Sequence, residues 1–348
     1  MINILVIGPS WIGDMMMSHS LYRTIKSQYP EAVIDVMAPD WCRSLLLRMP
    51  EVNKGLLLPF KHGELALKKR FYLGKFLQKN GLYDRAYILP NSFKSALVPF
   101  FAKIKRRIGW RGEMRYGLLN DIRVLDKSKF PLMVERYIAL AYDQPVHSSN
   151  LLPKPLLWPR LKVEENEKRL LMQQFILPND KLIIGFCPGA EFGPAKCWPY
   201  YYYALLAEQL IYEGYQVILL GAKKERKIGQ AIIQTLSNTT HSHCSNLIGH
   251  TKLEEAVILI SLCTAIVSND SGLMHIAAAL NCPIVALYGP SSPNFTPPLS
   301  NKTRIIHLSS HYDNIRTGNT KDGYHQSMIN ILPKLVYQEL NTLLYSIK

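Results

Sequence analysis

Three short segments of this 348-residue chain hold polar residues of the kinds that move protons or bind anions. Each follows an apolar run that predicts a buried strand and leads toward a segment that predicts a helix. In an open α/β sheet such loops gather at the carboxyl ends of the strands, where ligands bind. The three segments are residues 8–14, 187–199 and 269–275.

The first segment, GPSWIGD, ends in Asp14, at or near the start of a helix predicted over 15–28. A carboxylate there could face a cleft and act as a general base. From spacing alone, helix capping is the simpler interpretation, because aspartate is a common cap residue. The segment is not a dinucleotide-binding fingerprint, since GxGxxG is absent.

The second segment, CPGAEFGPAKCWP, carries Lys196 just before a Trp-Pro pair that suggests a helix entry. A lysine there could neutralise a phosphate as a point charge. It could equally be a solvated surface lysine, and the local sequence leaves both interpretations open.

The third segment, NDSGLMH, joins a predicted strand to a helix predicted over 273–280. Free N–H groups at a helix start form an anion site, and Gly272 would let a diphosphate approach closely. Ser271 and His275 are four residues apart and share a helix face. A helix cap and a satisfied core histidine are the alternative, but the convergence of polar groups favours a functional site.

Basic residues are concentrated between residues 94 and 123, with Trp110 and Tyr116 among them. Such a run is usually a solvated face. Beside a cleft it also suits a phosphorylated saccharide or nucleic acid, although no nucleic-acid motif accompanies it. The basic residues are Lys94, Lys103, Lys105, Arg106, Arg107, Arg111, Arg115 and Arg123.

Strand and helix patterns alternate in two halves, which predicts an α/β fold with two doubly wound domains. Prolines in the segment 151–163 mark the expected junction. The predicted strands are 2–8, 32–38 and 85–89 in the first half, and 181–186, 215–221, 265–268 and 283–288 in the second.

Composition narrows the class of protein. Forty-one Lys and Arg against 26 Asp and Glu give a formal charge of +15, which attracts anions. The six cysteines form no CxxC pair or zinc pattern, which predicts free thiols in a reducing compartment. A signal peptide and a bilayer-spanning run are both absent from the sequence pattern, so we expect a cytoplasmic protein that can rest on a membrane surface.

The three segments, together with LPNSFKSALVPFFA and GWRGEMRYGLLNDIRVLDK, closely resemble the ADP-heptose:lipopolysaccharide heptosyltransferases of glycosyltransferase family 9. The likeness covers essentially the whole chain. It implies a GT-B architecture, with two Rossmann-like domains facing across a cleft and a C-terminal helix crossing back. The implied parts are an acceptor domain over 1–155, a donor domain over 165–330, and a helix in 331–348 that packs on the first domain.

The resemblance also implies the reaction. The donor would be ADP-L-glycero-β-D-manno-heptose, transferred with inversion to the first inner-core heptose of lipopolysaccharide on Kdo2-lipid A. The stretches PSWIGDMMMS and FCPGAEFGPAK favour the transferase of the second heptose over that of the first. No metal or other cofactor is expected, and the partners would include an anionic membrane face but no nucleic acid.

Residue roles follow from the family motifs. Asp14 would be the general base, and Lys196 would hold the ADP phosphates. The other donor-site residues would be Asp270, Ser271, Gly272, His275, Gly189 and, for the adenosine ribose, Glu225, which is displaced here by two lysines in GAKKER. The hypothesised acceptor contacts are Lys94, Arg111, Arg115 and Arg123.

Three rival functions remain open from the sequence. One is the related transferase that adds the first heptose to Kdo2-lipid A. A second is a non-catalytic protein that binds nucleotides or anions, although Asp14 and Asp270 are both present. The third is a nucleic-acid binder, suggested by net charge alone.

Overall fold

The computed structural model describes residues 2–61, 63–191, 193–309, 312 and 315–346. The chain divides into two compact units, Met1–Pro159 and Arg160–Lys348, at a point inside the proline-bearing segment 151–163. Among the described residues, no helix has the length and apolar character needed to cross a membrane. All six cysteines are free and buried, as their spacing predicts.

The first unit is built on a six-stranded parallel sheet in the order β3-β2-β1-β4-β5-β6. Its strand β1 reads NILVI and is buried along nearly its whole length, as expected for a central parallel strand covered on both faces. The strands are β1 (Asn3–Ile7), β2 (Val33–Ala38), β3 (Lys54–Leu57), β4 (Arg85–Ile88), β5 (Arg106–Trp110) and β6 (Asp121–Arg123).

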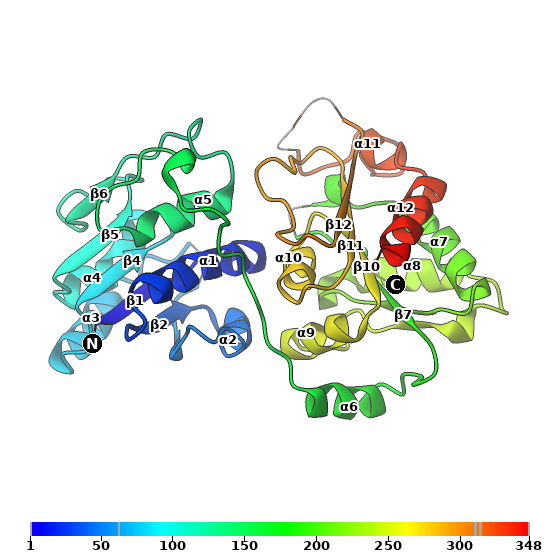
Figure 1. Ribbon diagram of the computed structural model, residues 1–348, viewed down its shortest axis with the longest axis horizontal. Coiled ribbons are helices and arrows are strands. Elements are labelled where there is room, and N and C mark those ends of the chain that lie inside the picture. The colour runs from blue at the N-terminus through cyan, green and yellow to red at the C-terminus, as the bar shows by residue number, and fades with distance from the viewer. Residues whose placement is uncertain (1, 62, 192, 310–311, 313–314, 347–348) are drawn as a thin grey trace. The chain divides into compact units, whose positions relative to one another are not determined.

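Helices cover both faces of this sheet (Figure 1). Helix α1 packs against α5, and α3 packs against α4. Leu77 of α3 and Val98 of α4 enter the same apolar cluster as Leu5 of β1. The helices are α1 (Ile12–Gln28), α2 (Asp40–Leu46), α3 (Leu67–Lys79), α4 (Leu97–Phe101) and α5 (Met133–Ile138).

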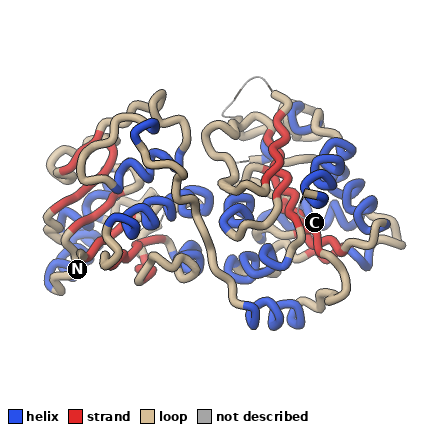
Figure 2. The backbone as a smooth tube through the Cα atoms, viewed as in Figure 1, coloured by secondary structure: helices blue, strands red, loops and turns tan. Residues whose placement is uncertain are grey.

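The second unit repeats this plan with a parallel sheet in the order β12-β11-β10-β7-β8-β9. Figure 2 shows its strands nearly edge-on, with helices on both sides. The strands are β7 (Ile183–Cys187), β8 (Gln216–Leu219), β9 (Cys244–Asn246), β10 (Ala265–Asn269), β11 (Ile284–Tyr288) and β12 (Thr303–His307). The helices are α6 (Glu165–Gln174), α7 (Tyr200–Tyr212), α8 (Arg226–Thr235), α9 (Leu253–Leu262), α10 (Gly272–Ala279), α11 (Gln326–Ile329) and α12 (Pro333–Tyr345).

Numbered within its own unit, each sheet has the order 3-2-1-4-5-6 of a Rossmann fold, which confirms the predicted α/β class. The strand order reverses between β1 and β4 in the first unit, and between β7 and β10 in the second. Ligands of open α/β sheets bind beyond the carboxyl ends of the strands at such a switch point. Asp14 follows β1, and Asp270 follows β10 directly.

The sequence predicts that residues 331–348 form a helix that packs on the first domain. The described part of this segment, α12, is anchored in the second unit, and its contact with the first domain stays a prediction. Helix α12 packs against α7 and against strands β10, β11 and β12 of the second unit. Its apolar side chains Val336, Leu340 and Leu343 are spaced along one helix face and enter the core that also holds Trp198. That burial fixes the helix to the second unit; residues 347 and 348 lie outside the described residues.

Candidate active site

Asp14 lies in the first turn of α1, near the helix start as predicted, although the helix begins at Ile12 and not at about residue 15. The cap residue is Trp11, whose carbonyl accepts the N–H of Met15. Within the described part of the chain, the Asp14 carboxylate accepts no capping hydrogen bond and has no ion-pair partner. The simple capping role that spacing favoured is therefore not what its side chain does.

Burial raises the pKa of Asp14 from 3.8 to about 6. Removing a carboxylate from water disfavours its charged form, and no described cation offsets that cost. A carboxyl group with a pKa close to neutrality can both take and release a proton at physiological pH, which suits a general base.

Asp14 lines a cavity of about 480 Å³ that lies wholly within the first unit. The indoles of Trp11 and Trp41, both more than half exposed, stand at its wall. Further lining residues come from the segments that follow β1, β3 and β4, and from α5 through Met133 and Tyr137. The cavity therefore combines one ionisable acid with flat aromatic surfaces, a combination suited to sugars.

The four predicted acceptor contacts separate into two kinds. Lys94 lines the cavity, whereas Arg111 is exposed but is not among the residues that line it. Arg115 is only 2% exposed, and its guanidinium donates to the carbonyls of Pro90, at 2.7 Å, and Trp110. It holds the loop that carries Lys94 and has little exposed surface to offer an acceptor; its contact with an acceptor stays a prediction.

Arg123 is buried in the same way, and its contact with an acceptor also stays a prediction. It is 3% exposed and donates to the carbonyls of Ala139, at 2.9 Å, and Tyr142, at 2.7 Å. Asp121 accepts from its Nε at 3.1 Å. Its guanidinium N–H groups are used to hold the segment that follows α5, because buried backbone carbonyls need hydrogen-bond donors.

In the second unit, Lys196 and Asp270 form an ion pair with Nζ and Oδ2 2.5 Å apart. The pair joins the loop after β7 to the loop after β10. Asn269, the last residue of β10, ties the loop after β7 to its own strand: its Nδ2 donates to the Pro188 carbonyl at 2.7 Å, and its Oδ1 accepts from the Trp198 N–H at 3.1 Å. Asn269 is the first residue of the segment NDSGLMH, but nothing in that sequence pattern predicts its bridging role.

Helix α10 begins at Gly272 with Ser271 as its cap residue, and the Ser271 side chain makes no capping bond to the described helix. The first N–H groups of α10 therefore remain available to an anion. His275 is buried, and burial lowers its pKa to about 4, so its ring is neutral at pH 7. A neutral, buried imidazole cannot supply a positive charge to a phosphate. It is better suited to supporting the phosphate site through packing and hydrogen bonding.

The Glu225 carboxylate lies against Gly189, at the carboxyl end of β7. A Cβ on Gly189 would lie 2.0 Å from the Glu225 carboxyl carbon, so a larger residue at this position would displace the Glu225 side chain. Burial raises the pKa of Glu225, while the Ala222 N–H donates to it at 2.6 Å. Glu225 therefore still lies at the strand ends of the predicted donor site, although two lysines precede it in the sequence.

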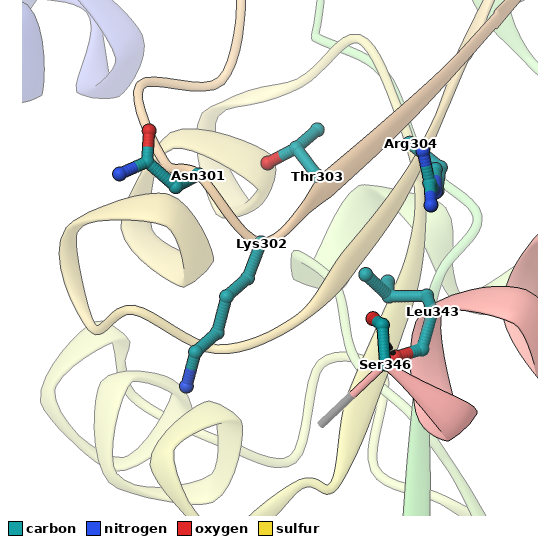
Figure 3. A pocket seen from close by; sticks show the side chains of 6 residues that line it. All are labelled: Asn301, Lys302, Thr303, Arg304, Leu343 and Ser346. Carbon is teal, nitrogen blue, oxygen red and sulfur yellow. Dashed lines mark hydrogen bonds between the residues drawn. The ribbon is translucent and has the colours of Figure 1, made fainter. Parts of the chain in front are cut away.

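A second cavity, of about 400 Å³, lies at the other end of this sheet. Figure 3 shows its residues coming from the start of β12, with Lys302 and Arg304, and from the end of α12, with Leu343 and Ser346. Because β11 and β12 are parallel, this cavity is at the amino ends of the strands, away from Asp270. It is not part of the predicted donor site.

Sequence reasoning missed several residues of the first cavity. Tyr137 is buried there, and its pKa is raised by burial and by the nearby Asp14. Arg70 is 4% exposed, lies over the Phe60 ring, and donates to the Leu65 carbonyl at 2.6 Å. These positions come from segments remote from the motifs, so only the fold brings them together.

Comparison with known proteins agrees with this architecture. The model of glycosyltransferase family 9 (heptosyltransferase) matches residues 70–325. Lipopolysaccharide heptosyltransferase 2 of Escherichia coli K12 is 62% identical, over 98% of both chains. Lipooligosaccharide heptosyltransferase 2 of Haemophilus influenzae is 53% identical, over 98% of this chain and 99% of the relative.

The solved structure of E. coli ADP-heptose LPS heptosyltransferase II superposes with a TM-score of 0.91, at 59% identity over 99% of both chains. This match confirms the predicted GT-B class, with two Rossmann-like units.

Proposed function

Because this chain belongs to glycosyltransferase family 9, the heptosyltransferases, we propose that it transfers L-glycero-D-manno-heptose from ADP-heptose to the first heptose of the lipopolysaccharide inner core. The observation that carries the proposal is the 62% identity, over 98% of both chains, to a lipopolysaccharide heptosyltransferase 2. Heptosyl-Kdo2-lipid A is then the acceptor.

Asp14 is proposed as the general base on the acceptor hydroxyl. The carboxylate takes the hydroxyl proton while the acceptor oxygen attacks the anomeric carbon of the donor heptose. The bond from that carbon to the diphosphate breaks, ADP leaves with the bonding electrons, and the configuration inverts in one displacement. The raised pKa of Asp14 and its place in the cavity support this role.

Lys196 and the start of α10 are proposed to hold the diphosphate as it departs. The lysine brings a positive charge, and the open N–H groups after Ser271 bring a positive helix end. Together they stabilise the charge that develops on the leaving group, so the transfer is proposed to run without a metal ion. Gly272 would allow close approach of the diphosphate, with Asp270 contacting the donor heptose and Glu225 the ribose.

Lys94 and Arg111 are proposed to meet the anionic groups of the acceptor. Both are accessible, unlike Arg115 and Arg123. The net charge of +15 supports work at the anionic cytoplasmic face of a membrane, with peripheral rather than spanning contact.

The test is transfer from ADP-heptose to heptosyl-Kdo2-lipid A and to Kdo2-lipid A, measured side by side as ADP release and acceptor mass. We expect turnover on the first acceptor only. Turnover on Kdo2-lipid A alone would identify the transferase of the first heptose. ADP binding with no turnover on either acceptor would favour a non-catalytic nucleotide-binding protein.

A further inference from the structure

Helix α3 exposes a face of aromatic and lysine side chains. Its inward stripe, which includes Arg70, Gly74 and Leu77, is buried in the first unit. On the opposite side, Tyr72 is 70% exposed and Phe76 is 63% exposed. Large aromatic rings at such exposure keep most of their surface in contact with solvent, so they are available to a partner.

Lysines surround these rings. Lys68, Lys75 and Lys79 are exposed and, at helical spacing, point the same way as Tyr72. The Lys75 ammonium also lies over the Phe71 ring, 5.7 Å from its centroid. The helix contains no acidic residue, so its outer face combines positive charge with aromatic surface.

Helix α4 extends the same surface. Gly74 lets the two helices touch, because a Cβ there would lie 2.5 Å from the Cβ of Phe101. Phe71 and Phe101 then stack edge to face at 5.2 Å, and Phe100 is exposed beside them. We call this surface the α3–α4 face, defined by Lys68, Tyr72, Lys75, Phe76, Lys79 and Phe100; Figure 1 shows the two helices side by side.

The charge of the surrounding chain is strongly one-sided. Residues 65–112 contain twelve Lys and Arg and a single acid, Asp84. A surface of this kind is complementary to anionic headgroups, which attract each nearby lysine, while aromatic rings settle at headgroup depth. Single-stranded nucleic acid also pairs phosphates with bases that stack on aromatic rings, so its binding is the contrary outcome of the test below.

We infer that the α3–α4 face is the surface by which this chain docks on anionic lipid headgroups. The inference rests on the proposed function, in which the acceptor is a lipid whose acyl chains stay in the bilayer. Arg70 of the same helix lines the Asp14 cavity, so docking through α3 would keep that cavity near the headgroups that carry the acceptor sugar.

The test is flotation of the full-length chain with phosphatidylcholine vesicles, with and without phosphatidylglycerol. The charge variant is Lys68→Gln, Lys75→Gln and Lys79→Gln together. The ring variant is Tyr72→Ser with Phe76→Ser. The matched control removes three exposed lysines of the second unit, by Lys227→Gln, Lys321→Gln and Lys334→Gln.

We expect binding only to vesicles that contain phosphatidylglycerol, weakening with salt. The charge variant should lose roughly fivefold in partitioning per lysine, on the order of a hundredfold in all. The ring variant should also bind less, and the control should lose far less than the charge variant. Equal losses in the charge variant and the control would overturn the inference, as would binding of single-stranded nucleic acid through these lysines without vesicle binding.

A second readout separates this inference from the proposed function. Transfer to membrane-embedded acceptor should fall in the charge and ring variants, while transfer to a deacylated, water-soluble heptosyl-Kdo2 acceptor should persist. If no acceptor is used but the vesicle results hold, the proposed reaction fails and the docking surface stands. If both acceptors are used normally by both variants, the docking surface is wrong.

Discussion

Asp14 and Asp270 occupy related places in two sheets of the same strand order, yet their surroundings differ. Asp14 follows β1 and lines a cavity without a cationic partner among the described residues, and burial raises its pKa to about 6. Asp270 follows β10 and is held by Lys196 at 2.5 Å. An unpaired, desolvated carboxylate is suited to proton transfer, whereas a paired one is suited to holding a charged group in place.

The largest effect should come from Asp14→Asn. The amide keeps the shape of the side chain but cannot accept the proton, so we expect the transfer rate to fall by roughly 10²–10⁴. ADP affinity, measured by calorimetry, should stay within the error of the native value. Asp40→Asn, at an exposed ion pair with Arg43, is the matched control and should be near native. A rate within a few-fold of native in Asp14→Asn would remove Asp14 from the chemistry.

The next largest effect should come from Lys196→Gln, which removes the cation that is paired with Asp270 in the second unit. Losing a cation on the leaving group should slow transfer by about 10² and weaken ADP binding as well. The ADP loss is what distinguishes it from Asp14→Asn. Lys224→Gln removes an exposed lysine paired with Glu191 and serves as its control. If ADP bound Lys196→Gln as tightly as the native chain, Lys196 would not be a phosphate ligand.

A smaller effect concerns stability and its dependence on pH. The unfolded Asp14 ionises near its ordinary pKa of 3.8, the folded one near 6, so the native state loses stability as pH rises between these values. The loss amounts to roughly 3 kcal/mol at most. Asp14→Asn should therefore melt at a higher temperature than the native chain at pH 8, and the difference should shrink toward pH 4. An equal or lower melting temperature at pH 8 would show that Asp14 isn't desolvated in solution.

The smallest effect should separate exposed from buried arginines in the first unit. Arg111→Gln should raise the KM for the acceptor by a few-fold, the size of a solvent-exposed charge contact, with the melting temperature unchanged. Arg115→Gln should do the reverse and lower the melting temperature, because it strands buried carbonyls at a cost of about 1–3 kcal/mol. Melting curves and acceptor titrations on both variants decide this. A large acceptor effect from Arg115→Gln without loss of stability would restore it as a contact residue.

The sequence predicts the fold well where the strands are central. Continuous apolar runs such as NILVI, IIGFC and IVALY are buried on both faces and show clearly as strands. The edge strand β12 is harder to find, because its exposed Arg304 and half-exposed Ile305 break the apolar pattern. The family resemblance supplied the GT-B class, but periodicity alone could not say which unit the amphipathic helix α12 would cover.

The candidate site likewise contains some residues that the sequence predicts and others that only the fold brings into place. Strand-to-loop motifs pointed to Asp14, Lys196 and Asp270, because each loop must lie at the carboxyl edge of its own parallel sheet. The basic run did not distinguish surface arginines from Arg115 and Arg123, since a guanidinium that binds carbonyls and one that faces solvent have the same sequence pattern. Tyr137 carried no local signal, because its place beside Asp14 depends on how α5 packs on α1.

The most direct test of the account is the pH dependence of single-turnover heptose transfer from ADP-heptose, for the native chain and for Asp14→Asn. If Asp14 is the base, the native rate should rise with pH, reach half its maximum near pH 6, and level off above it, because only the ionised carboxylate accepts the proton. The variant should be slow and should lack that inflection. A native rate that does not change between pH 5 and pH 7, both flanking the value of about 6, or an inflection that survives Asp14→Asn, would contradict the account.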